Sequence, residues 1–267
     1  MQRQPAVAGQ FYPGSAGQLR SELSRLIPDF SPKQHVYGVI SPHAGYVYSG
    51  SIAGQVFARI AIPGTVLIIG PNHHGIGAPA SLHPDGDWLT PLGTVKINAR
   101  LNELLLQHGS YLQSDRVAHQ REHSLEVQLP FIQYLRPGVT ISALCLGHGD
   151  YAALREIGIG IAAAIREYGE DVLIVASSDM THYESAESAR LKDQIALDRV
   201  VAFDGAGLLE VCRNRRITMC GVTPAVVMLE AARVLGASKA EVVAYATSGD
   251  VTGDNRDVVG YAGVMVD

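Results

Sequence analysis

Cysteine is scarce in this chain of 267 residues: there are three, Cys145, Cys212 and Cys220, and none forms a Cys-x-x-Cys pair. An odd number without that spacing argues against a disulfide framework and is typical of a reducing compartment. The first residues carry no apolar segment of the export type, and the longest apolar stretch, residues 157–165, is too short to cross a bilayer. We therefore expect a cytoplasmic protein with no membrane partner.

An excess of positive charge is also lacking, since 21 lysines and arginines face 26 acidic residues. No basic stripe is interleaved with aromatic residues, so nucleic acid is not an expected partner. The chain contains no G-x-G-x-x-G, no G-x-x-x-x-G-K-[ST] and no G-x-S-x-G sequence. These absences argue against Rossmann-type and P-loop nucleotide binding and against serine hydrolase chemistry.

What the chain has is a regular alternation of two kinds of segment. Short β-branched runs cover residues 36–40, 65–69, 139–146 and 172–176, and segments of helical period cover residues 52–60 and 151–168. This alternation predicts βαβ units around a mainly parallel sheet. No linker or repeat interrupts the chain, so we expect one α/β domain over residues 1–267, its central sheet flanked by helices.

The last third of the sequence is richer in helical patterns. Helices are predicted over residues 186–203, 207–212 and 224–235, and two strands over residues 241–245 and 258–266. Residues 78–98 alternate poorly and are predicted to form a β excursion from the main sheet.

Polar clusters follow three of the strand-like runs. His43 lies in Ser41–Tyr46, His73 in Gly70–Gly75, and Asp179 and His182 in Ser177–Tyr183. Ligands bind outside the carboxyl ends of strands in open parallel sheets. These side chains are therefore predicted to meet in one pocket.

His43 and His73 are separated by about one βαβ unit, which returns the chain to the same edge of a sheet. If their strands are neighbours, the two loops start only ~5 Å apart. Two imidazoles at that separation can share a metal ion, and Asp179 or another carboxylate would complete the two-histidine, one-carboxylate set that suits iron(II). The alternative is that each is a surface or packing histidine in an ordinary loop.

Thr181 and Glu184 match a capping box, with Thr181 as N-cap of the helix predicted over residues 186–203. His182 would then lie in the first helical turn, where the helix dipole disfavours imidazolium. A neutral histidine is suited to act as a general base.

Four further residues have two interpretations each. His123 and Glu126 are three apart and share one face if the segment is helical, either as a solvated surface or as part of the pocket. Cys220 is either a soft metal ligand or a small buried residue. Asp250 lies among turn-forming residues and is a candidate pocket carboxylate.

Taken together, five motifs resemble the Memo family, named for a mediator of cell motility. They are Pro42–Tyr46, Gly70–His74, Glu122–Glu126, Ser177–Asp179 with His182, and Cys220–Gly221, and the resemblance extends over nearly the whole chain.

The resemblance implies a fold similar to the class III extradiol dioxygenases, in which two histidines and an acidic residue hold iron. By motif, His43 and His73 match the ligand histidines, His182 matches the base, and Asp179 and His123 match polar residues that line the pocket. The pocket cysteine of animal members falls on Val251, which cannot bind metal. The third ligand is therefore open between Asp179, Asp250 and Cys220.

The resulting hypothesis is an iron(II)-dependent oxidoreductase of the extradiol type that acts on a small molecule, with zinc or copper as alternative metals. In this hypothesis His43, His73 and Asp179 bind the metal, and His182 and His123 are the catalytic residues. A second hypothesis is a non-catalytic metal- or peptide-binding accessory protein, because prokaryotic relatives are similar to a component found alongside a radical enzyme. A third is metal-assisted hydrolysis, which needs only a Lewis acid and water.

Overall fold

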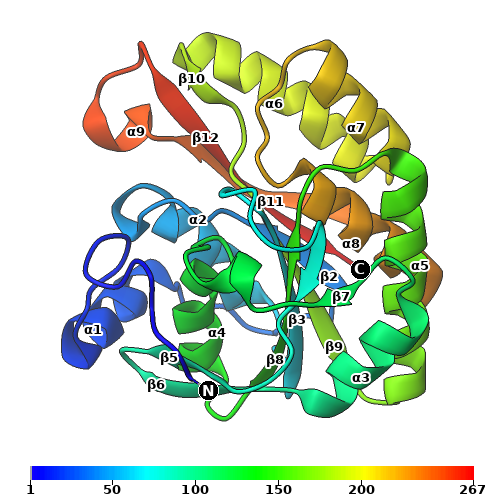
Figure 1. Cartoon of the computed structure of the whole chain (residues 1–267). Coiled ribbons are helices and arrows are strands. Elements are labelled where there is room, and N and C mark those ends of the chain that lie inside the picture. The colour runs from blue at the N-terminus through cyan, green and yellow to red at the C-terminus, as the bar shows by residue number, and fades with distance from the viewer. Residues whose placement is uncertain (1) are drawn as a thin grey trace.

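A twelve-stranded mixed sheet with helices on both faces forms the centre of the molecule in the computed structural model, which describes residues 2–267 (Figure 1). The strands are β1 Gln2–Arg3, β2 Gly38–Ser41, β3 Thr65–Pro71, β4 Ala80–Leu82, β5 Asp87–Thr90, β6 Gly93–Ile97, β7 Gln113–Ser114, β8 Thr140–Leu146, β9 Val172–Ser177, β10 His182–Glu184, β11 Ala240–Thr247 and β12 Val258–Val266. The helices are α1 Ala16–Leu26, α2 Tyr46–Arg59, α3 Ala99–His108, α4 Leu129–Leu135, α5 Tyr151–Tyr168, α6 Ala186–Val201, α7 Gly205–Asn214, α8 Val222–Leu235 and α9 Gly249–Thr252, with two short 3-10 turns at Val117–His119 and Glu126–Gln128.

Parallel pairing dominates the middle of the sheet. The order along it is β1-β5-β6-β8-β3-β9-β2-β12-β10, and the four strands β8, β3, β9 and β2 are mutually parallel. β12 runs antiparallel to β2 and also pairs with β11, so these two strands from the C-terminal part of the chain extend the sheet beyond β2. The predicted α/β domain with a mainly parallel central sheet is confirmed.

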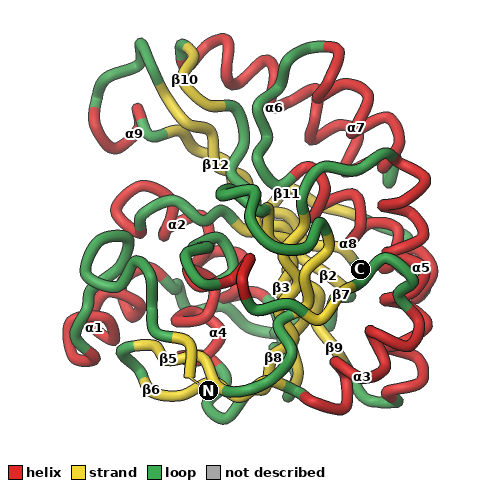
Figure 2. Tube along the Cα trace, viewed as in Figure 1, coloured by secondary structure: helices red, strands yellow, loops and turns green. Residues whose placement is uncertain are grey.

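Both faces of the parallel strands are covered, which explains their nearly continuous apolar sequences. Every residue of β3 and β9 is buried, as expected when helices pack on both sides of a parallel sheet. Helices α3, α5 and α8 cover one face and α1, α2 and α4 cover the other, each with its own apolar cluster (Figure 2). Within residues 2–267, no helix combines the length and the apolar character that a membrane span needs.

Residues 78–98 form the strands β4, β5 and β6, as the weak alternation there predicts. β5 and β6 make an antiparallel hairpin, and β6 continues the main sheet by pairing in parallel with β8. The excursion is therefore an extension of the same sheet.

Two local expectations are wrong. β2 and β3 are not neighbours, because β9 lies between them and pairs with both. The predicted capping box is absent: Ser185, and not Thr181, is the N-cap of α6, and its hydroxyl accepts the amide hydrogen of Ser188. His182 lies in strand β10, paired with β12, and not in the first turn of a helix.

Candidate metal centre

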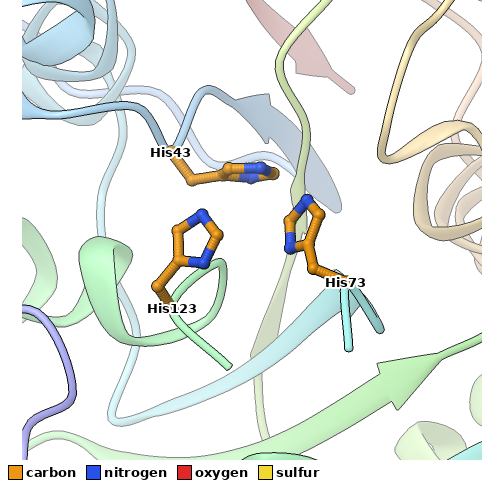
Figure 3. A group of neighbouring side chains, drawn as sticks. All are labelled: His43, His73 and His123. Atoms are coloured by element: carbon orange, nitrogen blue, oxygen red, sulfur yellow. The ribbon is translucent and has the colours of Figure 1, made fainter. Parts of the chain in front are cut away.

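Three imidazoles converge at the carboxyl edge of the parallel strands. One potential ligand atom from each of His43, His73 and His123 lies within 4.8 Å of the other two. Figure 3 shows the three rings pointing toward one another from different segments of the chain. The ring centroids are 4.7 to 5.4 Å apart. This spacing allows one ion to be held by three nitrogens.

His73 is oriented by a buried carboxylate. Its Nδ1 lies 2.8 Å from Glu122 Oε1, and its backbone amide donates to Glu122 Oε2 at 2.8 Å. Burial alone would raise the pKa of Glu122, but the hydrogen bonds from His73 and the Ser124 amide outweigh it and hold that pKa well below its usual range. A carboxylate accepts and does not donate, so Nδ1 carries the hydrogen and Nε2 is left to bind metal.

His43 is oriented by a buried hydroxyl. Ser177 Oγ donates its only hydrogen to the carbonyl of Ser124 at 2.6 Å and accepts from the amide of Gln128 at 2.8 Å. The 2.9 Å contact between Ser177 Oγ and His43 Nδ1 must therefore have Nδ1 as donor. His43 Nε2 thus keeps its lone pair, as a metal ligand requires.

His123 completes the group from the loop between the two 3-10 turns. Its ring stacks on His73 with an interplanar angle of 19°, and Phe11 packs edge-on against it at 4.9 Å. Nδ1 of His123 lies 3.5 Å from Glu122 Oε1. Burial lowers the pKa of His123 to about 4 and that of His43 well below 6.5, so both are neutral at pH 7 and able to bind metal.

Asp179 adjoins this group but lies outside it. One oxygen of its carboxylate accepts the backbone amides of His43 at 2.8 Å and Ala44 at 3.3 Å, so Asp179 fixes the loop that carries His43. Burial raises the pKa of Asp179 to about 6. The thiol of Cys220 lies 3.3 Å from His43 Nε2 and accepts the amide hydrogen of Asp179.

His182 faces the same cavity from strand β10. Its Nδ1 lies 3.0 Å from the carbonyl oxygen of Thr218, and its amide donates to the Thr218 hydroxyl at 2.7 Å. A carbonyl only accepts, so Nδ1 of neutral His182 carries the hydrogen and Nε2 is free to accept a proton.

The cavity over the three histidines has a volume of about 610 Å³. Its walls also include Asp179 and His182 and several aromatic side chains, namely Phe11, Tyr48, Tyr183 and Tyr261. A second cavity of about 600 Å³ adjoins it and shares His73, Thr218 and Cys220. Such a volume accommodates a small organic molecule.

Two other candidate residues are engaged elsewhere. Asp250 forms a bidentate ion pair with Arg190 at 3.0 Å and accepts the amide of Thr247 at 2.7 Å. Glu126 is fully buried, so the solvated-surface interpretation is wrong for it. Its carboxylate binds the N-terminal segment through Arg3 at 2.6 Å and the hydroxyl of Tyr12 at 2.7 Å.

Glu122 lies in the motif Glu122–Glu126, but no role was predicted for it, although its carboxylate orients His73. His43, His73 and Asp179 follow strand-like runs, whereas Glu122 and His123 lie in a loop that no strand precedes directly. The signal that was available is the adjacency of Glu122, His123 and Ser124, a cluster of acceptor, ligand and hydroxyl without apolar periodicity.

Together, the fold and the site define an α/β protein with a histidine-based candidate metal centre. Residues 3–265 match the family model described as Memo-like protein. The chain is 42% identical over 267 residues to a MEMO1 family protein of Methanosarcina acetivorans, with 99% of each chain covered, and 44% identical over 266 residues to one of Aquifex aeolicus, with 98% of each covered. The chain belongs to the Memo-like protein family.

A solved structure supports the fold independently. An uncharacterised protein of Escherichia coli K12 superposes with a TM-score of 0.59 at 10% sequence identity, covering 87% of this chain and 100% of that one. At this identity, the likeness concerns the fold alone.

Proposed function

We propose that His43, His73 and His123 bind one iron(II) ion and that the protein cleaves the ring of a small dihydroxylated aromatic molecule. The observation that carries this proposal is the convergence of the three imidazoles within 4.8 Å. Hydrogen bonds to Glu122 and Ser177 already set the tautomers of His73 and His43 that metal binding needs. The donor set therefore fits a transition metal, since imidazole nitrogen suits iron, zinc and copper.

The chain would contribute proton transfer and substrate orientation. Nε2 of His182 can take the proton of a substrate hydroxyl, because Nδ1 is engaged by the Thr218 carbonyl. Phe11, Tyr48 and Tyr261 supply aromatic surface against which a planar ring can pack. A bound iron(II) would supply the electron transfer through which O₂ reacts with the ring, and no further reductant is needed because both oxygen atoms enter the product.

Oxygen consumption tests the proposal. Protein purified without O₂ and loaded with iron(II) should consume O₂ when given catechol or 3,4-dihydroxyphenylpropionate, and a ring-opened product should appear in the visible spectrum. His182→Gln should keep its iron and lose about 10²–10⁴-fold in kcat, the usual contribution of a general base. His74→Gln is the matched control, since His74 is exposed and does not line the cavity. Equal rates in the two variants would rule out His182 as the base.

The three-histidine donor set also favours a second candidate function. Three neutral imidazoles are the ligands of catalytic zinc in carbonic anhydrase, where the metal activates water. We therefore propose zinc-assisted hydrolysis as the alternative. Zinc-loaded protein should then hydrolyse 4-nitrophenyl acetate while iron-loaded protein shows no O₂ uptake with catechols; the reverse result would exclude it.

A further inference from the structure

The second cavity, of about 600 Å³, shares part of its wall with the metal centre. It meets the cavity over the three imidazoles at His73, Thr218 and Cys220, which line both. Its remaining walls come mainly from the loop after β8, from helix α7 and from the loop that leads into α8. A molecule whose ring lies over the metal therefore has room to extend past His73 into this space.

The two cavities differ in the charge of their walls. Among residues 2–267, no lysine or arginine lines the cavity over the metal centre, to which Asp179 contributes a carboxyl group. The second cavity has the reverse composition, because Arg213 contributes a guanidinium group and none of the described lining residues is acidic. An anionic group on a ligand is therefore favoured in the second cavity and disfavoured in the first.

The guanidinium group of Arg213 is available to such a ligand. Arg213 lies in the last turn of α7, and within residues 2–267 its side chain takes part in no ion pair and no hydrogen bond. Two arginines close to α7 differ in this respect: Arg199 pairs with Asp204 and Arg233 pairs with Glu230. All five hydrogens of the Arg213 guanidinium thus remain free to be donated to a ligand.

Most of the other side chains in this wall are apolar, namely Leu146, Leu209, Ile217, Met219 and Val222. They belong to, or pack against, the apolar cluster that α5 and α8 form on one face of the sheet. Apolar walls favour hydrocarbon, and each methylene group that they remove from water tightens binding by about fourfold. The cavity therefore suits an arm that is apolar along its length and anionic at one point.

From this arrangement we infer that the substrate is a dihydroxylated aromatic ring with a short hydrocarbon arm that ends in a carboxylate. The inference rests on the proposed function, which places the ring over the metal. Arg213 is then the residue that determines specificity, because one guanidinium matches one carboxylate in charge and in geometry through two parallel hydrogen bonds. The imidazole of His148 lies in the same wall and can donate a further hydrogen bond.

Binding without turnover tests this inference. Zinc-loaded full-length protein is titrated calorimetrically in the absence of O₂ with catechol, 4-propylcatechol and 3,4-dihydroxyphenylpropionate. The last two compounds have arms of similar length and differ in the carboxylate. The titrations are repeated with Arg213→Gln and with Arg215→Gln. Arg215 is the matched control, since it is exposed at the same end of α7, does not line the cavity and loses the same charge.

The propyl arm should tighten binding about tenfold relative to catechol, because the apolar wall takes it from water. The carboxylate should add at least about a further threefold, a modest gain because Arg213 is exposed to solvent. This preference for the acid should disappear in Arg213→Gln, persist in Arg215→Gln and decrease as salt is added. Circular dichroism verifies that both variants are folded.

Two results would overturn the inference. Equal affinities for catechol and 4-propylcatechol would mean that the arm does not enter the second cavity. A preference for the acid that is absent, or that survives Arg213→Gln, would mean that Arg213 only stabilises the C-terminal end of α7. Oxygen uptake tests ring cleavage separately: if no catechol is consumed but the preference for the acid depends on Arg213, the proposed reaction fails and the binding specificity stands.

Discussion

The two histidine groups of this molecule have similar spacing but opposite surroundings. Rings in the metal centre are 4.7 to 5.4 Å apart, and those of His83 and His119 are 5.1 Å apart. In the centre, Glu122 and Ser177 hold Nδ1 of His73 and His43. Among residues 2–267, Nδ1 of neither His83 nor His119 has a hydrogen-bond partner, and the guanidinium groups of Arg3 and Arg116 lie alongside, each paired with a carboxylate. The neighbours of a histidine, more than its spacing, therefore decide whether a group of histidines suits a metal ion.

The largest expected effect concerns acid stability, in which the two groups should behave alike. Burial lowers the pKa of His123 and His83 to about 4 and that of His119 to about 3. Such a ring binds fewer protons in the folded than in the unfolded chain, so its contribution to stability is complete above pH 6.5 and is lost as the pH falls toward 4. Each histidine should cost about 1.4 kcal/mol per pH unit in that window.

Urea unfolding of the metal-free protein between pH 7.5 and 4.5 measures this loss. Asp179 acts in the opposite direction, because burial raises its pKa to about 6 and protonation relieves the cost. Asp179→Asn should therefore steepen the fall in stability below pH 6. A free energy of unfolding that stays constant down to pH 4.5 would contradict the neutral, buried state of these histidines.

Replacing a histidine should weaken metal binding in the metal centre but not in the pair of His83 and His119. His73→Ala should lower the affinity for zinc by more than about 100-fold, because removing a ligand exceeds the 10–100-fold cost of losing a supporting residue. His74→Ala is the matched control, and His119→Ala should leave zinc affinity unchanged. Isothermal titration with zinc provides the measurement. A loss with His119→Ala as large as with His73→Ala would abolish the distinction between the two histidine groups.

The next largest effect on zinc affinity should come from Glu122, whose carboxylate accepts the Nδ1 hydrogen of His73. Glu122→Gln keeps the shape but loses the negative charge that the Nδ1 hydrogen of His73 faces, so zinc affinity should fall about 10–100-fold. Glu230→Gln, another buried carboxylate, controls for the general effect of removing a buried charge. If the two variants bind zinc equally well, Glu122 is only a structural residue.

The smallest effect on zinc affinity should come from Ser177, whose hydroxyl accepts the Nδ1 hydrogen of His43. Ser177→Ala removes a neutral acceptor in place of a charged one, and zinc affinity should fall about tenfold or less. Ser142→Ala is the control, since Ser142 is buried and its hydroxyl has no partner among residues 2–267. A loss greater than that of Glu122→Gln would reverse the ranking of the two supporting groups.

The central strands and the position of His43 and His73 could be predicted from the sequence because burial on both faces leaves long apolar runs. The strand order could not, since nothing in the sequence shows that β9 inserts between β2 and β3. The two rings nonetheless lie 5.2 Å apart.

Loops and helix starts are harder to predict. His123 as a catalytic residue of the pocket stays a prediction, and its approach to the other two imidazoles depends on how residues 115–128 fold back, a tertiary feature without periodicity. The helix start was misplaced because Thr181 and Glu184 fit the capping-box pattern, whereas Ser185, the actual N-cap, is followed three residues later by Ser188. His182–Glu184 instead form β10, which pairs with β12.

X-ray absorption spectroscopy of zinc- or iron-loaded protein tests the central claim most directly, because it reports the atoms bound to the metal. With zinc, we predict three imidazole nitrogens at about 2.0–2.1 Å, with multiple scattering from three rings and no sulfur. The imidazole signal should decrease in His123→Ala. A sulfur at about 2.3 Å would instead place Cys220 among the ligands, and a spectrum with fewer than three imidazoles would contradict the proposed centre.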